Sequence, residues 1–271
     1  MMSDNLLLAF ALTTFAGLST GIGSAIGFFS KKTNKAFLSA TLGFSAGAMI
    51  YVSFVEIFFK AKESLTHVYG DYLANWYTAG SFFLGVLIIL IIDRLIPSYE
   101  NPHEPHKIEE MSTLTSSEIE AKKLKRMGMF TALAIAIHNF PEGLATFTAA
   151  MTDPTLGVSI AVAIAIHNIP EGIAVSVPIY FSTGSRKKAF WYSFATGLTE
   201  PIGAIIGYLV LQQFFNDTTF GILFGAVGGI MVFISVDELI PTAKRYDLGH
   251  NAIYGLVAGM AVMSFSLLMF I

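Results

Sequence analysis

The sequence Ala-Ile-Ala-Ile-His-Asn-Phe-Pro-Glu-Gly occupies residues 134–143, and Ala-Ile-Ala-Ile-His-Asn-Ile-Pro-Glu-Gly occupies residues 163–172. The two copies differ at one position, and each lies in a long apolar segment with almost no other charge. On a helix, residues three and four apart share a face. A helical conformation would therefore turn the histidine, asparagine and glutamate of each copy toward the same side.

These side chains predict a metal site. Imidazole nitrogen, amide oxygen and carboxylate oxygen are ligands for zinc, iron, manganese or cobalt. A lone buried histidine is more often a satisfied core residue than a ligand. Here the whole set occurs twice in segments long enough to span a bilayer, where each ionisable group costs roughly 2.5–3.5 kcal/mol and by default marks a functional path. The candidate ligands are His138, Asn139, Glu142, His167, Asn168 and Glu171.

Prolines accompany the candidate ligands. Pro141 and Pro170 have no N–H to donate, so each should weaken its helix next to the ligands. A later apolar segment repeats the combination with Glu200 followed by Pro201. Glu200 is either a seventh ligand at the same depth or an isolated buried carboxyl that stays protonated.

The composition indicates an all-α polytopic membrane protein. The 271 residues are 54% hydrophobic and 13% charged, with a mean hydropathy of +0.64, whereas soluble domains carry about 25% charged residues. Apolar segments long enough for a transmembrane helix predict eight spans. They cover about 6–29, 36–59, 73–97, 127–151, 156–181, 188–214, 219–241 and 250–271. The chain has no cysteine, so only nitrogen and oxygen donors can bind a metal.

The lysines and arginines predict the orientation. If alternate loops face the same side, every basic residue except Lys60 and Lys62 falls on one side, which the positive-inside rule makes cytoplasmic. Eight spans then place both termini outside the cytoplasm. The N-terminus has no basic region of a signal peptide, and the net charge of −3 gives no support for nucleic-acid binding.

We expect a single transmembrane domain over residues 1–271, with a polar cytoplasmic loop at about 98–126 between the third and fourth helices. His103 and His106 in this loop could hold a cation weakly, although two histidines are few. Glu56, toward the outer end of its helix, is either an interfacial residue or a ligand on the uptake side. Other acidic candidates lie at the cytoplasmic ends of helices, at Asp93, Asp237 and Glu238.

Several features together resemble the ZIP family of divalent-metal transporters, over the whole chain. They are the two His-Asn-x-Pro-Glu-Gly helices, the Glu-Pro of the next helix, Asp-Glu-Leu-Ile-Pro at 237–241 and the loop histidines. The resemblance implies a ZIP-type bundle with a binuclear metal centre. His138, Glu142, His167 and Glu171 would form a site suited to zinc. Asn139, Asn168 and Glu200, with the two bridging glutamates, would form an oxygen-rich site.

The resemblance also implies ligands on the exit side. Asp93, His103, His106 and Glu238 fall where the family keeps them. Asp237 stands where many relatives have histidine, so one nitrogen donor is missing there.

The implied function is uptake of zinc, with iron, manganese and cobalt as further candidate substrates, across the cell inner membrane. Family members are thought to move helices 1, 4, 5 and 6 against helices 2, 3, 7 and 8, and similar proteins form homodimers. The resemblance implies no cofactor and no enzymatic activity. Metal ligands must be deprotonated, so transport should weaken as pH falls. The alternatives are an intramembrane zinc-dependent hydrolase, which would need an activated water, and a passive divalent-cation channel.

Overall fold

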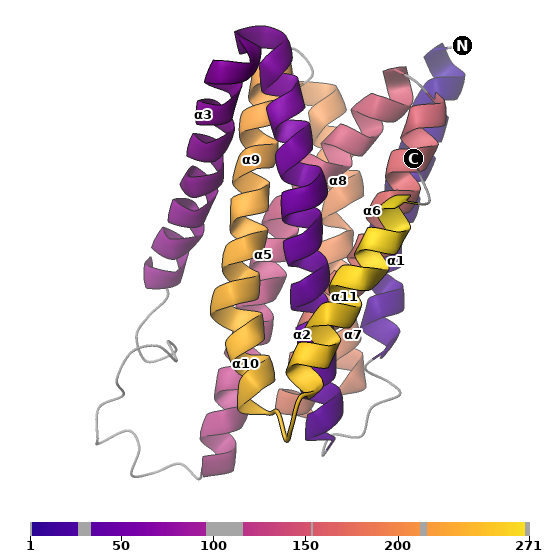
Figure 1. The fold of residues 1–271 in the computed structure, drawn as a ribbon. Coiled ribbons are helices and arrows are strands. Elements are labelled where there is room, and N and C mark those ends of the chain that lie inside the picture. The colour runs from indigo at the N-terminus through magenta and orange to yellow at the C-terminus, as the bar shows by residue number, and fades with distance from the viewer. Residues whose placement is uncertain (1, 27–33, 96–115, 153, 212–215, 269–271) are drawn as a thin grey trace.

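The protein is a bundle of long helices (Figure 1). The computed structural model describes residues 2–26, 34–95, 116–152, 154–211 and 216–268, and these contain no strand. The first half of the chain forms α1 (Met2–Ile26), α2 (Lys35–Val52), the π-helical turn η2 (Ser53–Ile57), α3 (Phe58–Leu95) and α5 (Ser116–Thr152). The second half forms α6 (Pro154–Thr183), α7 (Arg186–Gly197), α8 (Thr199–Ile206), η4 (Gly207–Leu211), α9 (Asp217–Ile234), η6 (Ser235–Leu239), α10 (Ile240–Arg245) and α11 (Asn251–Leu268).

The element α3 consists of two antiparallel arms. Gly70, with φ of 72°, reverses the chain between them in a conformation that glycine adopts without steric cost. The first arm continues the direction of α2 and η2, and the second arm returns beside α9 (Figure 1). The segment predicted at 36–59 therefore runs through α2, η2 and the start of the first arm, and the described part of the segment predicted at 73–97 forms the second arm.

The all-α membrane class is confirmed. Five helices of the described ranges are long and apolar enough to cross a membrane by length and composition alone. One of these five, Lys35–Ile92, includes both arms around Gly70. The count of eight spans stays a prediction.

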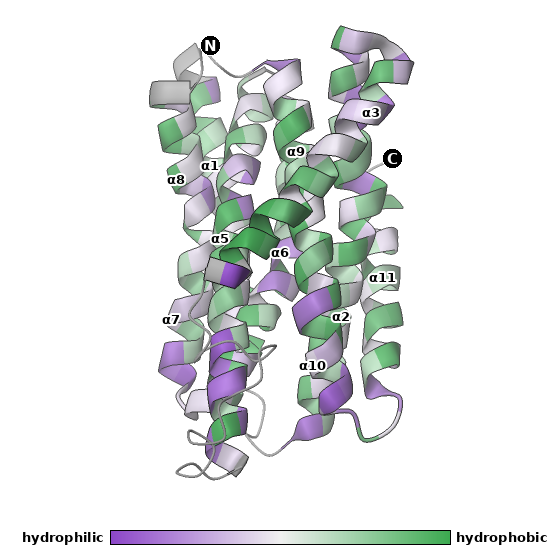
Figure 2. Cartoon of the chain, turned by 90° about the vertical axis from the view of Figure 1, so that its left-hand side faces the viewer, coloured by the Kyte–Doolittle hydropathy of each residue, from purple (hydrophilic) through white to green (hydrophobic). Residues whose placement is uncertain are grey.

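Hydrophilic residues gather at the lower end of the bundle, where α5 and α7 begin and α10 ends (Figure 2). At this end Arg245 Nη2 lies 3.8 Å from Glu120 Oε1. The first and last described residues both lie toward the upper end (Figure 1). The gathering of hydrophilic residues at the lower end agrees with the predicted segregation of basic residues. Which end faces the cytoplasm remains a prediction.

The described part of the expected polar loop is helical. α5 begins at Ser116, although the sequence predicted a loop until about residue 126. Residues 118–126 contain glutamate, alanine, lysine and leucine, which all favour helix, so the helix extends beyond the apolar segment. His103 and His106 lie outside the described residues.

Glycines bring helix backbones together within one group of five helices and within two separate helix pairs. The group of five, which we call the motif set, contains α1, α5, α6, α7 and α8. The two pairs are α2 with α11 and α3 with α9, and we call these four helices the flanking set. Among the described glycines, each close backbone contact joins helices of one set, and none joins the two sets. For example, a Cβ atom on Gly229 of α9 would lie only 2.0 Å from the carbonyl oxygen of Phe82 in α3. Small residues allow membrane helices to approach this closely.

We expect Gly229→Ala to lower the free energy of unfolding by about 1–3 kcal/mol, because the added methyl group must push α9 away from α3. The matched control is Gly80→Ala, since a Cβ atom there meets nothing within 4 Å. In the control, the better helix propensity of alanine should leave stability equal or slightly higher. Thermal unfolding of the purified proteins in detergent measures both. Equal melting temperatures for the two variants would contradict the close α3–α9 contact.

Candidate metal centre

The two repeated motifs lie on neighbouring helices and are buried. His138, Asn139 and Glu142 belong to α5, and their exposed fractions are 1%, 0% and 4%. His167, Asn168 and Glu171 belong to α6, with exposed fractions of 4%, 0% and 0%. A buried charged or polar side chain needs a partner to offset its lost hydration. These six side chains therefore need polar partners inside the bundle, and those partners fix their arrangement.

Glu200 reaches the same region from a break between two helices. α7 ends at Gly197 and α8 begins at Thr199, so Glu200, fully buried, lies in the first turn of α8. Pro201 follows and cannot donate a helical hydrogen bond, which explains the break. The predicted weakening of this helix is confirmed. Pro141 and Pro170, by contrast, lie inside the unbroken helices α5 and α6.

A glycine sets the distance between α5 and α8. A Cβ atom on Gly143 would lie 2.1 Å from the carbonyl oxygen of Glu200, so any side chain there would separate the two helices. Gly143 directly follows Glu142 in the motif. The motif therefore supplies both a carboxylate and the close contact that brings Glu200 to the same depth.

Each histidine pairs with the glutamate of the other motif. His138 Nε2 lies 2.7 Å from Glu171 Oε1, and His167 Nε2 lies 2.9 Å from Glu142 Oε1. The first contact has the geometry of a hydrogen bond, whereas the second satisfies the distance without the required angles. The cross-pairing brings two nitrogen and two carboxylate donors together between α5 and α6.

The asparagines extend this cluster. One end of the Asn139 amide lies 2.9 Å from His138 Nε2 and 3.2 Å from Glu171 Oε2. If this end is the amide nitrogen, it donates hydrogen bonds to both groups. If it is the amide oxygen, it faces only other acceptors, which is the arrangement of ligands around a cation. Asn168 Nδ2 donates to the carbonyl oxygen of Ala16 at 2.8 Å and also to Glu200 Oε1.

Several buried atoms of the candidate ligands have no hydrogen-bond partner within the described part of the chain. Leaving such an atom unpaired costs about 1–3 kcal/mol, and more for a charged group. Nitrogen and oxygen atoms of this kind are the donors that a divalent cation accepts. The unpaired atoms are His138 Nδ1, His167 Nδ1 and Nε2, Glu142 Oε2, Asn168 Oδ1 and Glu200 Oε2.

The donors do not form a preformed cage. Within the described ranges, no group of three or more histidine, aspartate and glutamate side chains is arranged to hold a metal ion. The side chains contact one another in pairs instead. Cation binding would therefore have to replace the histidine–glutamate contacts with bonds to the ion.

The structure brings all seven predicted central residues together, and the other described candidates, Glu56, Asp237 and Glu238, lie on separate helical turns. Glu56 lies on η2 and forms an ion pair with Lys60, at 2.7 Å. Asp237 and Glu238 lie on η6, where Glu238 is buried and Asp237 is half-buried. Asp93 lies in α3, but its side chain is outside the description, as are both loop histidines.

Two buried serines make polar contacts with the motifs that the sequence pattern did not predict. Ser45 Oγ of α2 donates to the carbonyl oxygen of Pro170, at 2.7 Å. In addition, Ser193 Oγ donates to the carbonyl oxygen of Gly172 at 2.8 Å. Both serines are buried, and the sequence identified neither as a partner because it does not show which helices are neighbours.

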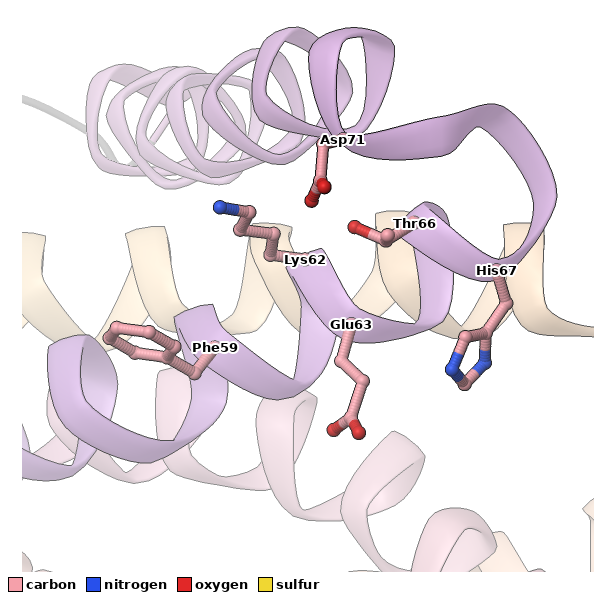
Figure 3. A pocket seen from close by; sticks show the side chains of 6 residues that line it. All are labelled: Phe59, Lys62, Glu63, Thr66, His67 and Asp71. Carbon is pink, nitrogen blue, oxygen red and sulfur yellow. The ribbon is translucent and has the colours of Figure 1, made fainter.

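A surface pocket lies apart from the metal centre. Its walls come from α3 alone, near the reversal at Gly70, and Figure 3 shows Lys62, Thr66 and Asp71 pointing into the same space. Glu63 and His67 point away from Asp71 in this view. The pocket is therefore no part of the cluster between α5 and α6.

Comparisons with known proteins agree on one family. The family described as ZIP Zinc transporter matches residues 97–267. The chain is 59% identical over 278 residues to "Zinc transporter ZupT" of Clostridium perfringens, with 99% of this chain and 98% of that protein covered. It is 58% identical to "Zinc transporter ZupT" of Nitratidesulfovibrio vulgaris, with both chains fully covered. It is 60% identical to the protein of the same name from Chlorobium chlorochromatii, with 99% of this chain and 100% of that protein covered.

The cluster predicts that zinc stabilises the purified protein. At zinc one hundred times above the dissociation constant, binding to the folded state alone adds about 2.7 kcal/mol to the free energy of unfolding. Glu142→Gln keeps the side-chain size but removes a charged donor, so this variant should lose most of the zinc-induced rise in melting temperature. The exposed Glu63, mutated to Gln, is the matched control and should keep the full rise. A normal zinc response in Glu142→Gln would contradict the assigned site.

Proposed function

The chain belongs to the ZIP zinc transporter family, and we propose that it takes up zinc across the bacterial cytoplasmic membrane. The observation that carries this proposal is the cross-pairing of two buried histidines with two buried glutamates on adjacent helices. Ionisable groups at membrane depth are costly and by default mark a transport path. The family also favours a transporter over an intramembrane hydrolase.

We propose two overlapping metal sites that share Glu142 and Glu171. The first adds His138 and His167, whose imidazoles favour zinc over harder ions. The second adds oxygen ligands from Asn139, Asn168 and Glu200, which would also accept iron, manganese or cobalt. The unpaired oxygens of Glu142, Asn168 and Glu200 support this division.

Binding requires a change in the pairing of the side chains. Zinc accepts the neutral imidazole and the ionised carboxylate, so protons shared between histidine and glutamate must leave as the ion binds. The contact between His167 Nε2 and Glu142 Oε1 lacks hydrogen-bond geometry, so a cation should break it more easily than the His138–Glu171 hydrogen bond. We infer that the ion first binds on the His167 side.

Release on the opposite side needs a conformational change. The motif set and the flanking set each contain glycine-mediated backbone contacts, but no such contact of the described residues connects them. The hydrogen bond from Ser45 to Pro170 is a contact between the sets that a sliding motion would break. We propose that the motif set moves as a unit and carries the metal centre, with basic loops cytoplasmic and both termini outside.

Uptake of zinc into proteoliposomes tests the proposed function. Glu171→Ala removes a ligand from both proposed sites. Loss of a residue that only supports a ligand typically lowers metal affinity about 10–100-fold, so loss of the ligand itself should cost at least as much. Zinc and iron uptake should therefore both fall by at least about tenfold. Saturable uptake by the unmodified protein distinguishes a carrier from a passive channel. Normal uptake of either ion by well-inserted Glu171→Ala protein would refute the bridging role.

Selectivity should separate the two sites. Replacement of His138 and His167 by alanine removes only nitrogen donors, and we expect it to depress zinc uptake more than iron uptake. Replacement of Asn139 and Glu200 by alanine removes only oxygen donors and should have the reverse effect. Competition uptake of zinc against iron at matched protein levels measures the ratio. If both double mutants lose the two ions in equal proportion, a single shared site is the correct description.

A further inference from the structure

Two helices of the flanking set contain the same pattern. Residues 47–57 read Gly-Ala-Met-Ile-Tyr-Val-Ser-Phe-Val-Glu-Ile, and residues 229–239 read Gly-Ile-Met-Val-Phe-Ile-Ser-Val-Asp-Glu-Leu. Glycine, methionine, serine and glutamate occupy equivalent positions, and most of the others are similar apolar residues. The first copy runs through α2 and η2, and the second runs through α9 and η6. The repeat therefore places Glu56 and Glu238 at equivalent positions on two different helices.

The two copies adopt the same local structure. Each ends in a π-helical turn that contains the glutamate, at Ser53–Ile57 and Ser235–Leu239. The serine that opens each turn is buried and donates to the carbonyl oxygen four residues earlier, at 2.6 Å for Ser53 and 2.7 Å for Ser235. Single π-helical turns inside α-helices occur frequently at functional sites, because the extra residue redirects a side chain.

Glu56 carries a feature that points to a ligand. Its side chain is only 13% exposed, and its Oε2 atom is buried without a hydrogen-bond partner among the described residues. Its Oε1 atom lies 2.7 Å from the ammonium nitrogen of Lys60, one turn further along the helix. The Lys60 side chain is 35% exposed, so it is more accessible than the Glu56 side chain.

The pair interacts electrostatically with residues of the candidate metal centre. Glu56 is within electrostatic range of His167, and Lys60 is within range of Glu142. His167 and Glu142 are the two residues whose mutual contact lacks hydrogen-bond geometry.

Resting on the proposed function, we propose that Glu56 is the first carboxylate to bind the incoming divalent cation, and that Lys60 is a built-in competitor for it. The ammonium group neutralises Glu56 when no metal is bound, which offsets the cost of a carboxylate at this depth. An incoming divalent cation displaces Lys60, binds both oxygens of Glu56 and passes to His167 and Glu142. The displaced ammonium group then returns to Glu56 and opposes the backward step.

The ion pair sets the apparent affinity for the cation. A partly exposed ion pair contributes a modest free energy, so its removal should alter the zinc concentration for half-maximal uptake by about two- to fivefold. Lys60→Met should lower that concentration, because Glu56 is then free to bind the ion. Glu56→Gln should raise it. In the Glu56→Gln background, Lys60→Met should have no further effect.

The matched control is Lys62→Met, which removes the same charge two residues away. Lys62 forms no ion pair with Glu56 within the described contacts and lines the α3 pocket instead (Figure 3). Loss of general surface charge would lower the half-maximal concentration in both lysine variants, whereas the proposal requires the effect at Lys60 alone. Zinc binding to the purified proteins, measured by competition with a fluorescent chelator, provides a second readout.

The outcomes separate the inference from the proposed function. If the unmodified protein takes up no zinc, the proposed function fails. If it takes up zinc but Lys60→Met and Lys62→Met behave alike, or if Lys60→Met acts equally without Glu56, the competitor role is wrong. A lower half-maximal concentration and tighter zinc binding in Lys60→Met, both abolished in the double mutant, support it.

Discussion

Buried histidines that face buried glutamates across two helices are the constraint on which this structure depends. A carboxylate or imidazole in the apolar interior must be paired or hydrogen-bonded, because its lost hydration is otherwise not offset. His138 meets Glu171 and His167 meets Glu142, so neither motif is satisfied without the other. The pairing requires α5 and α6 to lie side by side with the motifs at one level. The same groups are the proposed metal ligands, so the contacts that stabilise the helix pair are those a transported cation would replace.

Close packing around this pair places the remaining donors. Gly143 allows α8 to approach α5, and the break at Leu198 directs Glu200 into the first turn of α8. Glycine contacts join α1 to α6 and to α7, while a different group of glycines joins α2 to α11 and α3 to α9. Among the described residues, glycine contacts thus pack the motif set together and pack the flanking helices as two pairs. Such a division suits a protein in which one part must carry an ion past the other, since each set can keep its own contacts during the movement.

Much of this arrangement could be predicted from sequence, for physical reasons that also explain the omissions. The repeated His-Asn-x-Pro-Glu-Gly motif predicted the two helices with candidate ligands. The prolines predicted weakened helices at all three places, but only the helix beside Pro201 is broken, whereas α5 and α6 continue through Pro141 and Pro170. The sequence did not show that each histidine faces the glutamate of the other motif, because that depends on helix register. The π-helical turns at Ser53 and Ser235 were not predicted, since one inserted residue leaves the apolar pattern intact. The extension of α5 to Ser116 was missed because its residues are polar, although they favour helix.

X-ray absorption at the zinc edge, on the purified zinc-bound protein, tests the central claim most directly, because it reports the atoms bonded to the ion. A ligand shell with imidazole at about 2.0–2.1 Å is predicted, with carboxylate oxygens at about 2.0–2.2 Å. The imidazole signal should vanish when His138 and His167 are both replaced and persist when His103 and His106 are replaced. An imidazole signal that depends on the loop histidines and not on His138 and His167 would contradict a metal centre between α5 and α6.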